Sequence, residues 1–119
     1  MLVLSRLPEE VVEILGRGLK IAVKVVETRG KRVQLELTGT GVTFVRSEIA
    51  PLFAPDPTRE RRGGPLLLSR KEQERILCYL PSGEVAEIVV VRVSENKVRL
   101  GFEFSDAFKI LREELREAA

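Results

Sequence analysis

The sequence predicts a mainly β fold, made of two similar five-stranded units in one chain. The first observation is a repeated motif, because "MLVLSR" at the N-terminus recurs as "PLLLSR" at residues 65–70. The second is the stretch after each copy, where apolar and polar residues alternate as in half-buried strands. The 119 residues therefore divide into unit one (residues 1–50), a linker (51–64) and unit two (65–119).

The two units stay in register over most of their length. The opening motifs align with a shift of 64 residues, and "KRVQLEL" aligns with "NKVRLGF" with a shift of 65. Near the ends "FVRSEI" aligns with "ILREEL", which places Arg46 on Arg112 and Glu48 on Glu114. Agreement over three separate stretches favours a duplicated unit over a chance likeness between strands.

Each unit is expected to contain an opening strand, a short strand, a long hairpin and a closing strand near Arg46 or Arg112. "LKIAVKVV" and "EIVVVRV" are rich in β-branched residues, which suit a pleated surface. The long hairpins should turn at Gly30 and Asn96, which tolerate a positive φ. A second hairpin is expected around "GRG" at 16–18 and "PSG" at 81–83.

The C-terminal stretch "SDAFKILREELREAA" has two interpretations. It can be one helix capped by Ser105, or a short strand through Phe108 and Ile110 followed by a helix from about Arg112. The repeat favours the second, because the matching "GVTFVRSEI" alternates and has no helical stripe. We therefore expect a closing strand and a C-terminal helix.

The linker between the units combines chain-breaking residues with a basic run. Pro51, Pro55 and Pro57 interrupt regular structure, and Gly63 and Gly64 follow them. The "RERR" run at 59–62 is either a solvated part of the linker or an arm that contacts RNA.

Composition points to a binding protein. Hydrophobic residues make up 44% and charged residues 32%, and the net charge is +2. The chain has no His, which excludes His-ligated metals and the Ser-His and Cys-His nucleophile pairs. No stretch approaches the ~20 apolar residues of a membrane span. We expect a cytoplasmic protein without cofactor or enzymatic activity.

Several motifs together resemble the carbon storage regulator family (CsrA/RsmA) of bacterial translational regulators. In unit one they are the opening motif, "KIAVKVVETRGKRVQLEL" and "VRSEI". In unit two they are "LLLSRK", "NKVRLGFEF" and "ILREEL". The resemblance covers nearly the whole chain outside the linker.

The resemblance implies an architecture and a function. Family members are five-stranded subunits with a C-terminal helix that form intertwined homodimers, and RNA with a GGA motif binds where the first strand of one subunit meets the last strand of the other. Here one chain would carry both halves and pair them as an intertwined pseudo-dimer, which is a monomer in solution. Its partners would be GGA-containing mRNA or small RNA, and it would regulate translation.

Two sites follow by position, each joining an opening strand to the closing arginine of the other unit. The residues that the resemblance assigns to them are Leu4, Arg6 and Arg112 for one site and Leu68, Arg70 and Arg46 for the other. Arginine offers a planar fork of donors for phosphate or guanine and can stack on a base. The alternative is that these arginines are ordinary surface residues at strand ends.

The sequence departs from the family where Glu9 and Gln73 occupy the region of a family Gly. In addition, unit one has Glu36 where Gly101 of unit two keeps the family's Leu-Gly step. A second hypothesis therefore stays open, a protein-interaction module that keeps the fold and has lost RNA binding. The partner that the resemblance implies in that case is a protein antagonist at the C-terminal helix.

Overall fold

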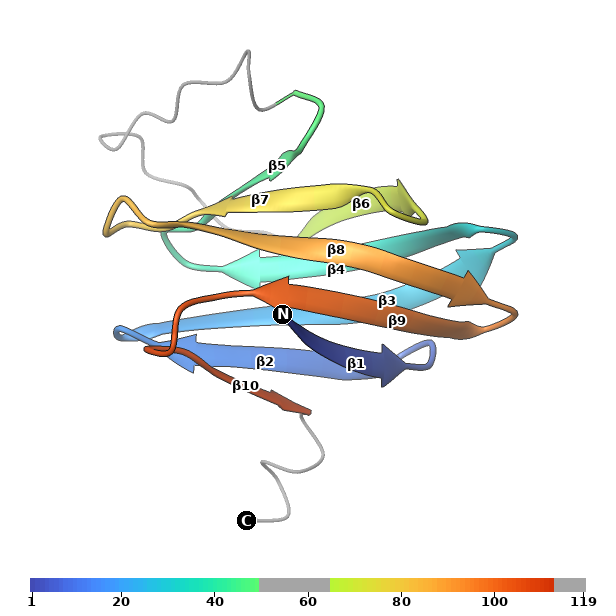
Figure 1. Cartoon of the computed structure of the whole chain (residues 1–119), viewed down its shortest axis with the longest axis horizontal. Helices are drawn as coiled ribbons and strands as arrows, with labels where there is room; N and C mark the ends of the chain where they lie inside the picture. Colours follow the sequence, from blue (N-terminus) through green and yellow to red (C-terminus); the bar gives the residue numbers. More distant parts are fainter. Residues whose placement is uncertain (50–64, 113–119) are drawn as a thin grey trace.

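The computed structural model describes residues 1–49 and 65–112, which form ten strands in two antiparallel five-stranded sheets (Figure 1). In chain order the strands are β1 (Leu2–Arg6), β2 (Val11–Gly16), β3 (Leu19–Arg29), β4 (Arg32–Gly39), β5 (Thr43–Arg46), β6 (Leu66–Lys71), β7 (Arg75–Tyr79), β8 (Val85–Ser94), β9 (Lys97–Glu103) and β10 (Lys109–Arg112). The linker, residues 51–64, lies outside the described residues, so the division into units stays a prediction.

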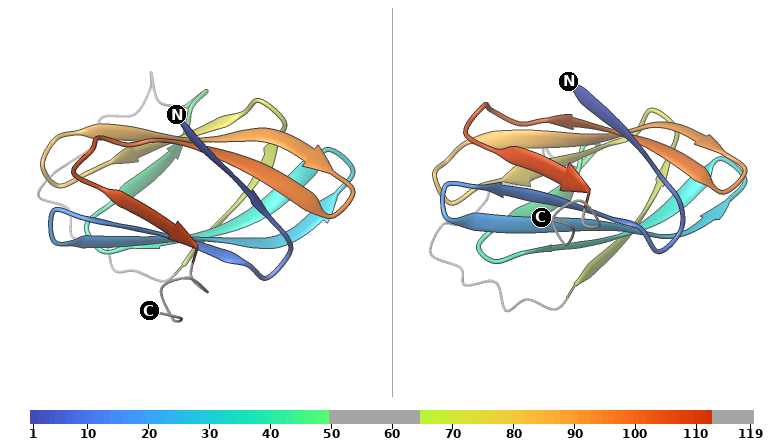
Figure 2. Two further views of the ribbon diagram at one scale, coloured as in Figure 1. Left: turned by 60° about the horizontal axis from the view of Figure 1, so that its bottom comes forward. Right: turned by 90° about the horizontal axis from the view of Figure 1, so that it is seen from below.

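Each sheet combines three consecutive strands of one half of the chain with two strands of the other half. The strand orders are β1-β9-β8-β7-β5 and β10-β2-β3-β4-β6, and Figure 2 shows the two layers. Strands β1 and β5 of the first half thus become the edges of the second half's sheet, and β6 and β10 the edges of the first half's sheet. The described parts of the two halves are intertwined, because neither sheet is complete without strands from both.

One apolar core fills the space between the sheets. On β3 the side chains of Ile21, Val23 and Val25 are fully buried, and on β9 those of Leu100 and Phe102 are almost completely buried. The residues between them on β3 are less buried, which gives the period-2 pattern of a strand with one face in a core. Since both halves supply this core, burial of apolar surface stabilises them only together.

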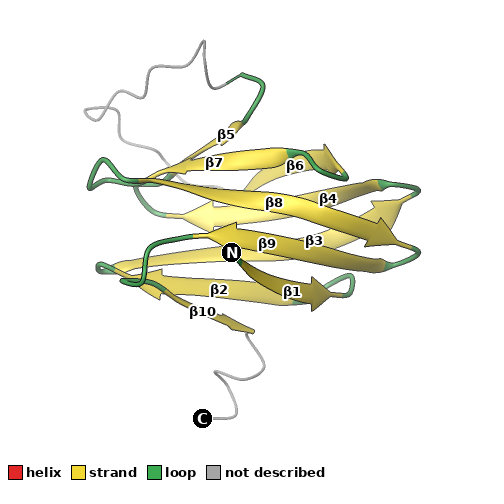
Figure 3. Cartoon of the chain, in the orientation of Figure 1, coloured by secondary structure: helices red, strands yellow, loops and turns green. Residues whose placement is uncertain are grey.

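The prediction of a C-terminal helix is wrong for the described residues, which contain no helix (Figure 3). Arg112, where we placed the start of that helix, is the last residue of β10 and pairs with Val12 of β2. Pairing with β2 gives the backbone of Lys109–Arg112 hydrogen bonds along one side of the strand, and Ile110 packs against the core. Residues 113–119, the rest of the expected helix, lie outside the described part. No described segment is a helix that could cross a membrane.

The long hairpins turn where we expected, with one change of residue. Gly30 has a φ of 61°, and in the other hairpin Glu95, not Asn96, has a positive φ, of 54°. The registers explain the difference, because Arg29 pairs with Arg32 and Ser94 with Lys97. Glu95 is therefore the first residue of its two-residue turn, the position that Gly30 has in the other.

Glu9 and Gln73 share an unusual backbone conformation, with φ values of 74° and 70°. The backbone N–H of Glu9 donates to the carbonyl of Val25, and that of Gln73 donates to the carbonyl of Val90, both at 2.6 Å. The two acceptors lie where β3 and β8 have irregular register. A positive φ favours glycine, so this geometry gives a physical reason for the Gly that the resembled family has in this region.

At position 9, glycine is expected to give a more stable protein than alanine. Glu9→Gly should raise the free energy of unfolding by about 1 kcal/mol relative to Glu9→Ala, because only the alanine keeps a Cβ in the left-handed region. Both variants lose the same 3.0 Å ion pair with Lys24, so their comparison isolates the backbone. Urea denaturation measures the difference, and equal midpoints would contradict it.

The first half alone is not expected to fold as a monomer. A fragment of residues 1–52 would keep the β2-β3-β4 sheet but lose β6 and β10 from its edges and the facing sheet from its core. We expect unfolded, aggregated or dimeric material by light scattering and NMR. A well-dispersed spectrum from a monomeric fragment would refute this.

Candidate nucleic-acid interface

The predicted site residues lie along the two open sides of the sandwich. Strands β1 and β10 are edges of different sheets on one side, and β5 and β6 are the edges on the other (Figure 1). The β1/β10 junction and the β5/β6 junction are defined by the predicted residues, Leu4, Arg6 and Arg112 for the first and Leu68, Arg70 and Arg46 for the second. The edge strands of a junction are not paired with each other, since β1 pairs with β9 and β10 with β2.

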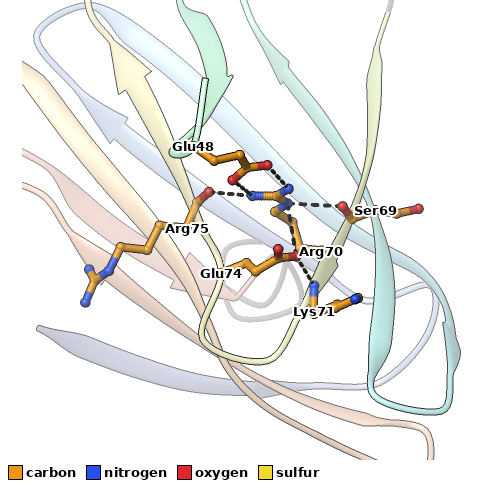
Figure 4. Close-up of polar contacts among 6 residues, drawn as sticks. All are labelled: Glu48, Ser69, Arg70, Lys71, Glu74 and Arg75. Carbon is orange, nitrogen blue, oxygen red and sulfur yellow. Dashed lines mark hydrogen bonds and ion pairs between the residues drawn. The ribbon is translucent and has the colours of Figure 1, made fainter. Parts of the chain in front are cut away.

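Arg70 is the centre of the β5/β6 junction and is only 4% exposed. Its Nε donates to the carbonyl of Ser69 at 3.1 Å, and its Nη1 donates to the carbonyl of Arg75 at 3.1 Å. Glu48 accepts from both terminal nitrogens, at 2.9 Å from Nη1 and 2.5 Å from Nη2 (Figure 4). Two parallel charge-assisted hydrogen bonds make this the strongest pairing geometry between arginine and carboxylate. Arg70 is therefore firmly held within the protein.

Glu48 belongs to the junction through its charge as well as its contacts. The hydrogen bonds from Arg70 are the main reason that the pKa of Glu48 falls from 4.5 to about 2, and the charge of Arg46 lowers it further. Glu48 is thus ionised at neutral pH, and the charges of Arg70 and Arg46 both favour its ionised form. Sequence alignment showed an Arg-x-Glu ending in both halves, but it did not identify Glu48 as a functional residue.

Arg46 ends β5, pairs in register with Ile76 of β7 and is half-buried. The backbone N–H of Ser47, the next residue, donates to the carbonyl of Arg75 that also accepts from Arg70. The structure therefore brings Arg46 and Arg70 to the same strand end. Leu68 points into the core and is 8% exposed, so its side chain is not presented to a ligand.

The β1/β10 junction repeats this arrangement around Arg6, which is 5% exposed. The Nε of Arg6 donates to the carbonyl of Ser5 at 2.9 Å, and its Nη1 donates to the carbonyl of Val11 at 3.5 Å. Val11 corresponds to Arg75 in the other half. Glu114, which aligns with Glu48, lies outside the described residues. The two junctions therefore use equivalent backbone acceptors.

Arg112 lies close to Arg6 in the structure. It pairs with Val12, and the carbonyl of the preceding residue, Val11, accepts a hydrogen bond from Arg6. Its Nε is buried without a hydrogen-bond partner among the described residues. Leu4 is half-buried and packs against the core, as Leu68 does. At both junctions the structure thus gathers the two arginines and turns the leucine inward.

A row of three cations on the outer face of one sheet was missed by sequence reasoning. Lys71 pairs with Arg32, and Arg32 pairs with Arg29, so three exposed positive side chains lie next to one another across β6, β4 and β3. Like charges opposite each other destabilise a sheet. Within the described ranges no acidic side chain forms an ion pair with any of the three. The hairpin "RGKR" contains part of this signal, but only the strand register adds Lys71.

Comparison with known proteins finds a family similarity in the second half of the chain. Residues 66–119 match the sequence model of the CsrA family, described as a global regulator protein family. This half is similar to the CsrA family. The translational regulator CsrA of Wolinella succinogenes is 45% identical over 53 residues, which cover 44% of this chain and 64% of that relative. No solved structure matches the chain at a significant level.

The pairing between Glu48 and Arg70 predicts an acid-dependent loss of stability. The pKa of Glu48 is lowered in the folded state, so its contribution is complete above the unfolded value of 4.5 and is lost as the pH falls toward about 2. Other carboxylates also titrate in this range and change the stability of both proteins. Glu48→Gln therefore serves as the reference, because it lacks only the carboxylate of Glu48. The stability difference between wild type and Glu48→Gln, measured by urea denaturation, should be constant above pH 5.5 or so and shrink below pH 4.5. A difference that stays constant down to pH 2.5 or so would contradict the prediction.

Proposed function

We propose that this protein is an RNA-binding post-transcriptional regulator that recognises GGA-containing mRNA or small RNA at the β1/β10 and β5/β6 junctions. One observation carries the proposal. A closing arginine and a buried opening-strand arginine meet at both junctions around equivalent backbone carbonyls, those of Val11 and Arg75. The similarity of residues 66–119 to the CsrA family supports it. We extend to this chain the role named for the Wolinella succinogenes relative, which is a translational regulator.

The chemistry of the junctions suits single-stranded RNA. Each junction lies at open strand edges, where backbone N–H and C=O groups without a neighbouring strand can read the edges of splayed bases. Arg46 and Arg112 provide guanidinium forks for phosphate or guanine. The cation row of Arg29, Arg32 and Lys71 starts at the edge strand β6 and offers contacts to the phosphate backbone.

The proposal includes the assembly. A single chain supplies both junctions, so we propose a monomer that acts as a pseudo-dimer with two RNA sites, in the cytoplasm and without catalysis. The protein-interaction module remains the second hypothesis, and the RNA titration below distinguishes the two.

Loss of a closing arginine should remove one RNA site at a time. We expect Arg46→Ala to weaken the β5/β6 junction and Arg112→Ala to weaken the β1/β10 junction, each by about 1–3 kcal/mol, which is tenfold or more in affinity. Isothermal titration with a short GGA hairpin should show two sites per chain in the wild type and one strong site in each variant. A hairpin with a scrambled loop should bind weakly.

Arg17→Ala is the matched control for this titration. It removes the same charge from an exposed arginine that pairs with Glu84 at 2.6 Å and belongs to neither junction. It should keep both sites. If wild type fails to distinguish the GGA hairpin from the scrambled one, or the closing-arginine variants keep both sites, the RNA proposal fails. The protein-interaction hypothesis then replaces it.

A further inference from the structure

We infer that Arg70 and Glu48 form a positioning pair that holds Arg46 in place at the β5/β6 junction, and that Arg70 does not itself contact the RNA. The inference rests on the proposed function of that junction. It differs from the residue assignment that the family resemblance implies, in which Arg70 and Arg46 both belong to the RNA site. Three features of the junction support it.

The first feature is that four of the five N–H donors of Arg70 are already used. A guanidinium has five N–H donors. One on Nε serves Ser69, two on Nη1 serve Arg75 and Glu48, and one on Nη2 serves Glu48 (Figure 4). With 4% of the residue exposed, a phosphate or base could reach Arg70 only by displacing Glu48. Displacement would leave an ionised carboxylate beside a polyanion, which is unfavourable.

The second feature is the set of elements that these contacts connect. Arg70 lies on β6, an edge of one sheet, whereas Glu48 follows β5, an edge of the other sheet. Strand β5 has only four residues and pairs with β7 alone. The Glu48–Arg70 pair therefore gives the end of this short strand a second attachment, to the opposite sheet.

The third feature is the closeness of Arg46 to this attachment. Arg46 precedes Glu48 by two residues, and the intervening Ser47 binds the same Arg75 carbonyl as Arg70. If Glu48 is released, the backbone that carries Arg46 keeps one fewer contact to the sandwich. The guanidinium of Arg46 would then lose orientation before RNA arrives, and binding would have to restore it at a cost in affinity.

The two possible roles of Arg70 predict opposite effects of removing Glu48. If Arg70 contacts RNA, Glu48 competes with the RNA, and Glu48→Ala should raise affinity. Removal of a negative charge near a polyanion would raise it further. If the pair positions Arg46, Glu48→Ala should lower affinity despite the favourable change in charge. A decrease therefore cannot come from electrostatics alone.

The test is a titration of the full chain with the GGA hairpin, followed at each junction. We expect Glu48→Ala to weaken the β5/β6 junction about tenfold. Glu48→Gln keeps one acceptor oxygen for Arg70 and should recover part of the lost affinity. If Glu48→Ala fails to fold, the affinity of Glu48→Gln still tests the inference. Glu27→Gln, which removes an exposed acid on β3 outside the junction, should leave affinity unchanged or slightly higher.

Double mutants separate positioning from a general structural role. The effect of Glu48→Ala should largely disappear in an Arg46→Ala background, because both act through Arg46. It should add fully to Arg112→Ala, which affects the other junction. Unchanged or higher affinity in Glu48→Ala and Glu48→Gln, with lower stability only, would overturn the inference while wild-type RNA binding upholds the function. Absence of wild-type binding would instead reject the function and this assignment together.

Discussion

The structure depends on the antiparallel pairing of outer strands from each half with the central strands of the other half. Strand β1 pairs with β9, β5 with β7, β6 with β4 and β10 with β2. This exchange closes both sheets around one core and at the same time creates the two junctions. Arg6 and Arg70 are buried near the ends of β1 and β6, where these strands lead into the following turns. Stability and the candidate site therefore have a common origin.

Much of this arrangement could be predicted from local patterns, and the remainder depends on contacts between distant segments. Period-2 alternation indicated β3, and Gly30 marked a turn. Within residues 1–49 and 65–112 the prediction of a C-terminal helix was wrong, because pairing with β2 places Arg112 in a strand, and no local pattern contains that pairing. The four hydrogen bonds of Arg70 could not be predicted from the sequence either. Two of them are accepted by Glu48, which follows an edge strand of the other sheet.

Two halves in one chain are free to differ, as two identical subunits are not. A Cβ on Gly101 would lie 2.5 Å from the Sδ of Met1 and 2.7 Å from the Cγ1 of Val89, so Met1 packs where only glycine fits. The corresponding residue of the other half is Glu36, which pairs with Leu67. One outer surface is thus closely packed and the other is charged at the same position. The junctions can therefore differ in affinity while the fold is kept.

The pairing of β1 with β9 also constrains how the chain reaches its native state. Leu2 lies opposite Phe102, so residues 100 positions apart in sequence must meet before the sheet is complete. Such distant contacts carry a large loop-closure entropy and are typical of proteins that fold in milliseconds to seconds. On the ribosome the β2-β3-β4 hairpins can form early, whereas β1 must wait until β9 has been synthesised. During that interval the first strand is an unpaired edge, and the rate of translation sets how long it stays exposed.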